Sequence, residues 1–185
     1  TIKAHRVYLE EIVGYYNKKG QVSSQYKVAR KKAFLAMSDL SSAFQRMTQE
    51  PRSRQKDLDK IYKVVVLNHT FLSLAASLGT FIRHHTTTEA STHFDIYINS
   101  IGKNLEAAYK SLYLGEVSEL NTQEEVKNAQ IYLEDKYLAL AEQPILNTEQ
   151  PSSRINTQLQ EVKMIADQLK WMLGISENLI KAVEG

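Results

Sequence analysis

Apolar residues recur every three or four positions along most of this chain, and Gly, Pro and polar clusters interrupt the pattern at intervals. One face of an α-helix repeats every 3.6 residues, so this spacing predicts helices and not strands. We expect six of them, at approximately residues 8–20, 26–50, 53–82, 94–115, 121–143 and 155–183. The predicted fold class is all-α: an elongated up-and-down helical bundle of about six helices, three of them long, in a single domain covering residues 1–185.

Local signals place several of the helix ends. Gly20 suits a left-handed terminator for the first helix, and Pro51 ends the second because the residue before a proline avoids the α region. Ser53 is the expected N-cap of the third helix. Asn121 with Glu124 is close to a capping box at the start of the fifth.

The third helix is the most apolar, and two readings of it compete. Residues 64–81 carry no formal charge, which is nearly the length of a membrane span. Asn68, His69 and Thr70 interrupt that run, however, and its flanks are polar. We therefore favour a helix at the centre of a bundle, in which these three polar residues form a buried hydrogen-bonded cluster that fixes the helix register.

Composition narrows the class of protein. Hydrophobic residues make up 43% and charged residues 24%, which is typical of a globular chain, and only 7 Gly and 3 Pro occur, which favours long helices. The absence of Cys excludes disulfides and thiolate metal sites. The net charge of +2 is too weak to indicate a nucleic-acid partner.

The charge is unevenly distributed along the chain. Residues 1–32 hold eight Lys or Arg against two acids, a net charge of +6, whereas the remainder carries −4. Lys27, Lys31 and Lys32 lie away from the apolar stripe of the second helix and can be solvated. Arg30 lies roughly 20° from Met37 on a wheel of about 100° per residue, within that stripe. A charge there is costly, so we expect a salt bridge or hydrogen-bonded anchor from Arg30 to a neighbouring helix, ahead of a lipid or ligand contact.

Candidate chemistry is sparse. His84, His85 and His93 invite a metal reading, but adjacent histidines rarely both bind one ion, so we expect exposed loop histidines and no metal site. The sequence shows no Gly-rich phosphate loop, nucleophile elbow or HExxH motif. We therefore expect no catalytic residues, no cofactor and no enzyme activity.

One combination of motifs resembles a known family. The second helix begins with Tyr26-Lys27-x-Ala29-Arg30-Lys31 and ends in Met47-x-x-Glu50-Pro51, and the third contains Asn68-His69-Thr70. Over residues 22–83 this pattern resembles the C-terminal soluble region of YccS-type inner-membrane proteins, of the fusaric-acid-resistance (FUSC), or aromatic acid exporter-like, superfamily. Lysines at 27 and 31 depart from the arginines of that pattern.

The resemblance implies a cytoplasmic helical domain of a bacterial inner-membrane transporter-like protein, with a regulatory, assembly or structural role. The expected partners are the transmembrane part of its own parent chain, an anionic membrane surface bound weakly by Lys27, Lys31 and Lys32, and further copies of itself in a homo-oligomer, with no nucleic acid. The chain begins at Thr1, without an initiator Met or a signal-peptide pattern, which predicts a piece of a larger protein. Tyr26, Arg30, Lys31, Asn68 and His69 are its candidate structural anchors. The alternatives are a free-standing helical adaptor and a ligand-sensing bundle that binds aromatic acids among its tyrosines.

Overall fold

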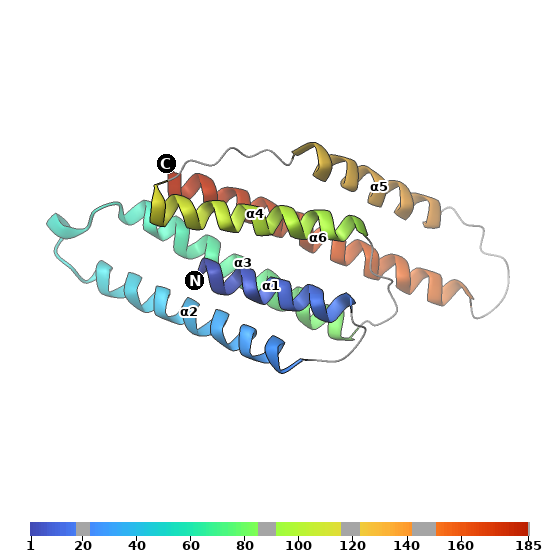
Figure 1. The fold of residues 1–185 in the computed structure, drawn as a ribbon, viewed down its shortest axis with the longest axis horizontal. Helices are drawn as coiled ribbons and strands as arrows, with labels where there is room; N and C mark the ends of the chain where they lie inside the picture. The colour runs from blue at the N-terminus through green and yellow to red at the C-terminus, as the bar shows by residue number, and fades with distance from the viewer. Residues whose placement is uncertain (18–22, 85–91, 116–122, 142–150, 185) are drawn as a thin grey trace.

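The computed structural model describes residues 1–17, 23–84, 92–115, 123–141 and 151–184, and the predicted all-α bundle is confirmed in this part of the chain. Consecutive helices run in opposite directions along a common long axis (Figure 1). They are α1 (Ile2–Asn17), α2 (Ser24–Thr48), the 3-10 turn η1 (Arg52–Arg54), α3 (Leu58–His84), α4 (Thr92–Leu114), α5 (Gln123–Ala141) and α6 (Pro151–Glu184).

Four helices form the centre of the bundle and two lie outside it. α1, α3, α6 and α4 pack in a ring in which each contacts the next. α2 packs on α1 and α3, whereas α5 packs on α4 and α6, on the opposite side (Figure 1). The chain is thus two three-helix halves, α1–α3 and α4–α6, that pair their helices in the same way.

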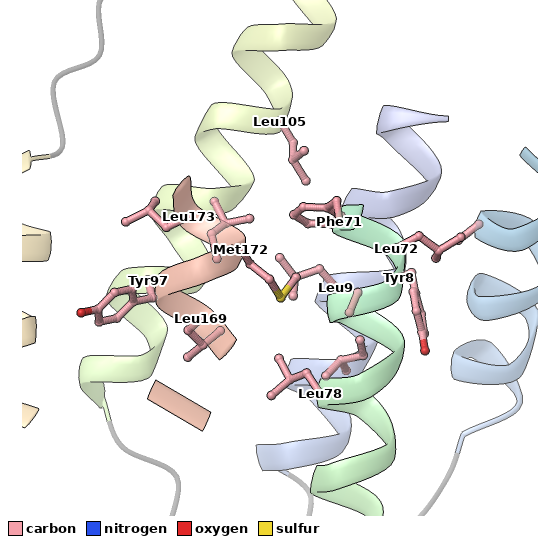
Figure 2. Close-up of a cluster of buried hydrophobic side chains, with 14 of the residues drawn as sticks. Tyr8, Leu9, Phe71, Leu72, Leu78, Tyr97, Leu105, Leu169, Met172 and Leu173 are labelled. Atoms are coloured by element: carbon pink, nitrogen blue, oxygen red, sulfur yellow. The ribbon is translucent and has the colours of Figure 1, made fainter. Parts of the chain in front are cut away.

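The core lies between the four inner helices. Figure 2 shows Leu9 of α1, Phe71 of α3, Leu105 of α4 and Met172 of α6 among the side chains that meet there, and all four are fully buried. Burying an apolar side chain of this size stabilises a fold by about 1.5–3 kcal/mol. These contacts hold the two halves together, since each of the four helices contributes to the same cluster.

The corner between α2 and α3 differs from the prediction. Ser53 does not cap α3, because it lies in the 3-10 turn, and α3 begins only at Leu58. Asp57 has a φ of 53°, a left-handed conformation that prevents the helix from starting earlier. The side-chain amide of Gln55 donates to the carbonyl oxygens of Thr48 (3.1 Å) and Glu50 (2.7 Å), which supplies partners at the C-terminal end of α2.

Within the described residues, α3 is the one helix long and apolar enough to cross a membrane, judged by length and composition alone. The core helix of a bundle passes the same test. α3 packs against α1, α2 and α6, and its exposed positions include Lys63, His69 and Ser73. This packing favours the reading of α3 as a bundle helix.

Candidate functional site: the exposed basic face of α2

Two buried tyrosines fix α2 against the bundle. Tyr26 of α2 and Tyr8 of α1 are both buried, and their hydroxyl oxygens lie 3.4 Å apart. Both approach Gly79 of α3 so closely that a Cβ at this position would lie 2.7 Å from the Tyr26 oxygen and 3.4 Å from the Tyr8 oxygen. A side chain at this position would force Tyr26 to shift where α1, α2 and α3 meet. Tyr26 is thus one of two predicted anchors that the structure buries, the other being Asn68.

The start of α2 is set by a cap. Ser23 Oγ accepts a hydrogen bond from the Tyr26 backbone N–H at 3.0 Å, and its hydroxyl donates to Glu11 Oε2 of α1 at 3.3 Å. The cap supplies a partner to one of the unpaired N–H groups of the first turn and ties the helix start to α1. The orientation of the basic residues that follow is thereby set.

Arg30 does not occupy the position predicted for it. The buried residues of α2 are Tyr26, Ala29, Ala33 and Met37, and Arg30 is exposed at the edge of this strip. In the described part of the chain, no carboxylate pairs with it, so the predicted salt bridge is not found. The strip is narrow because α2 contacts only α1 and α3, and Arg30 lies about 20° beyond Met37, outside the edge of the strip.

Arg30 lies over an aromatic ring of its own helix and influences a tyrosine of α1. Its guanidinium lies 5.4 Å from the centre of the Phe34 ring on the same helix. Burial raises the pKa of the Tyr8 hydroxyl, its hydrogen bond with Tyr26 raises it further, and the charge and hydrogen bonding of Arg30 oppose both. The charge of Arg30 thus acts on a buried hydroxyl of α1, and the predicted anchor to a neighbouring helix stays a prediction.

Beyond this edge, α2 presents a charged and apolar surface. We call Lys27, Val28, Lys31, Lys32 and Leu35 the basic face of α2; all five are exposed, Val28 by 50% and Leu35 by 54%. The first turn of α2 holds no acidic residue, and the described carboxylates form no ion pair with these lysines. Positive charges near a helix N-terminus oppose the helix dipole. An anionic surface would relieve this unfavourable arrangement.

The Asn-His-Thr motif in α3 is divided between the core and the solvent, so the predicted buried cluster is wrong. Asn68 is buried and donates to the carbonyl oxygen of Val64 at 2.8 Å, whereas His69 is exposed. Thr70 donates to the Val66 carbonyl on the surface. Consecutive residues of a helix point about 100° apart, so three in a row cannot share one face.

Two buried polar features were missed from the sequence. His5 of α1 is fully buried and stacks on Phe71 at 5.5 Å, without a hydrogen-bond partner for either ring nitrogen. Burial, helped by the positive N-terminus, lowers its pKa to about 3. Asn104 of α4 donates to Ser176 Oγ of α6 at 3.0 Å inside the core. His5 falls three positions before Tyr8 on the same apolar stripe, and this spacing was a signal that could have found it.

The described residues do not support a metal site at the histidines near the end of α3. His84 is exposed beside Arg83, while the side chains of His85 and His93 lie outside the described part. No group of three or more potential metal ligands occurs among the residues that the structure describes.

Two surface grooves lie away from α2. One, of about 630 Å³, runs between α1 and α4 and contains the Arg6–Glu106 ion pair. The other, of about 360 Å³, lies between α4, α5 and α6 and is lined by Tyr97, Lys163 and Lys170 among others. Burial raises the pKa of Tyr97, and the charge of Glu134 adds to the effect, so this hydroxyl stays protonated at neutral pH.

In comparisons with known proteins, no family model, curated protein or solved structure matches the chain.

Proposed function

We propose that this chain is the cytoplasmic helical domain of a bacterial inner-membrane transporter-like protein of the FUSC kind, with no catalysis of its own. In this proposal the basic face of α2 is directed at the anionic membrane surface. The motif resemblance in residues 22–83 supports the class of protein. The single observation that carries the membrane contact is the set of exposed lysines on α2, which pair with no carboxylate among the residues that the structure describes.

The expected interaction is weak and electrostatic. A lysine close to an anionic leaflet contributes about 1 kcal/mol. Lys27, Lys31 and Lys32 together therefore contribute about 3 kcal/mol before screening, and the exposed side chains of Val28 and Leu35 can add apolar contact. Because the charges are exposed, added salt screens this attraction.

Co-sedimentation with vesicles tests the membrane contact. We expect binding to vesicles of phosphatidylcholine with phosphatidylserine, and none to phosphatidylcholine alone. Lys27→Gln/Lys31→Gln/Lys32→Gln should abolish most of it. The matched control replaces three exposed lysines of α5 and α6, Lys127, Lys170 and Lys181, with Gln and should bind as the unchanged protein does. Equal losses in both variants would show that net charge and not this face governs binding.

The groove between α4, α5 and α6 supports a second candidate, a ligand-sensing role. The buried Tyr97 lines it with Lys163 and Lys170, which suits a small aromatic carboxylate. Glu134 and Asp167 of the same groove, however, oppose an anion. A thermal shift with a panel of aromatic acids at millimolar concentration tests this role, and Lys170→Gln should reduce any shift. An unchanged melting temperature with every acid would argue against it.

A further inference from the structure

α5 presents an exposed surface of the opposite sign to that of α2. Ile131 is 48% exposed and Leu138 55%, and between them lie the exposed acids Glu134 and Asp135. We call these four residues the acidic face of α5. Glu134 accepts a hydrogen bond from the neighbouring Gln130, and in the described part of the chain neither acid forms an ion pair. Like the lysines of α2, they have no ion-pair partner among the described side chains.

The two faces share one pattern of positions. On α2 the order is Val28, Lys31, Lys32, Leu35, and on α5 it is Ile131, Glu134, Asp135, Leu138. Each is an apolar residue, two like charges three and four positions later, and a second apolar residue seven positions from the first. At 1.5 Å per residue, the apolar pair on each helix is separated by about 10 Å along the axis. The pattern reads the same in both directions, so either relative orientation aligns lysines with acids.

These faces cannot meet within one molecule. α2 and α5 lie on opposite sides of the four inner helices and have no contact with one another (Figure 1). A contact between them must join two copies of the chain.

We propose that the basic face of α2 in one copy docks on the acidic face of α5 in a second copy. Val28 and Leu35 pack against Ile131 and Leu138, while Lys31 and Lys32 pair with Glu134 and Asp135. The contact is head-to-tail, because it uses two different surfaces, and it therefore builds chains or rings of copies. One helix against one helix is a small interface, so the association is weak and salt-sensitive.

This proposal goes beyond the proposed function, and the two contacts share residues of α2. Lys31 and Lys32 serve both the membrane contact and the contact with a second copy. The two contacts exclude one another at a given α2, so anionic vesicles should dissociate the assemblies. Only the self-association needs α5, and this separates the two ideas experimentally.

Sedimentation velocity over a range of protein concentrations, at about 0.03 M and about 0.5 M NaCl, tests the association. We expect concentration-dependent assembly at low salt that is lost at high salt. Lys31→Glu/Lys32→Glu and Glu134→Lys/Asp135→Lys should each weaken association at least about tenfold, because like charges then face each other. The control Lys63→Glu/Lys181→Glu, on α3 and α6, should associate as the unchanged protein does, because both lysines are exposed and lie away from the two faces.

Mixing supplies the decisive result. An equimolar mixture of the two charge-reversed variants should recover association, because the reversed α2 of one then meets the reversed α5 of the other, and recovery also shows that both are folded. The α5 reversal should bind anionic vesicles undiminished. A protein that stays monomeric at low salt, an α5 reversal without effect on association, or a mixture that fails to recover would each overturn the proposal. Vesicle binding by the Lys27→Gln/Lys31→Gln/Lys32→Gln variant tests only the membrane contact, so its outcome does not decide whether the copies associate.

Discussion

The close approach of Tyr26 to Gly79 offers a sharp test of how α2 is held. Gly79→Ala places a Cβ 2.7 Å from the Tyr26 hydroxyl oxygen and 3.3 Å from Ile12 Cγ1. Overpacking of this kind costs about 1–3 kcal/mol, whereas Gly to Ala inside a helix gains about 0.5–1 kcal/mol. We expect a net loss of up to about 2 kcal/mol, and a domain of this size loses roughly 2–4 °C of Tm per kcal/mol.

Tyr26→Phe separates the two contributions. It removes the oxygen that clashes, at the cost of a long hydroxyl contact of about 0.5–1.5 kcal/mol. In this background Gly79→Ala should be neutral or stabilising. The double-mutant cycle should therefore give a coupling energy of about 1–3 kcal/mol between the two positions.

Urea unfolding followed by circular dichroism measures all four proteins. Gly102→Ala in α4 is the matched control, since no atom lies within 4 Å of its Cβ, and it should stabilise by about 0.5–1 kcal/mol. If Gly79→Ala stabilised the protein as much as Gly102→Ala does, or if the coupling energy were zero, the close approach of Tyr26 to α3 would be refuted.

Three further predictions concern buried or strained residues. The unfolded chain protonates His5 below pH 6.5, whereas the folded chain does so only near pH 3. The free energy of unfolding should therefore fall on acidification through this window, by about 2 kcal/mol between pH 6.5 and 5. His5→Leu should reduce this pH dependence in urea titrations, and an identical pH dependence would contradict the burial of His5. Asn104→Ala should cost about 1–3 kcal/mol, and Ser176→Ala added to it should cost little more, because their shared hydrogen bond is already lost; fully additive losses would argue against the bond. Asp57→Val should lower the Tm, whereas Asp57→Gly should not, because only the β-branched residue resists a φ of 53°; equal effects would speak against the left-handed turn.

The helices could be predicted from apolar spacing because the residues that a helix buries recur with the helical period. The spacing that gave Tyr26, Ala33 and Met37 as inward positions is the spacing that the structure buries. The fate of Arg30 was not predictable, since a wheel shows direction but not the number of neighbouring helices. Because Asp57 adopts a left-handed conformation, α3 begins at Leu58 and not at the predicted Ser53, and the sequence analysis did not predict this conformation. The exposure of the α2 lysines could be predicted from their distance to the apolar stripe. Their complementarity to the acids of α5 could be recognised only from the arrangement of the whole bundle.

The outer position of α2 has a consequence for its local stability. This 25-residue helix contributes only four buried residues to the core, although it is as long as the inner helices α3 and α4 to within two residues. Helices with few buried contacts open at a lower free energy than the core and exchange their amide hydrogens sooner. We therefore expect the amide hydrogens of α2 to exchange sooner than those of the four inner helices. A partner that binds the lysines of α2 should slow this exchange in α2 first.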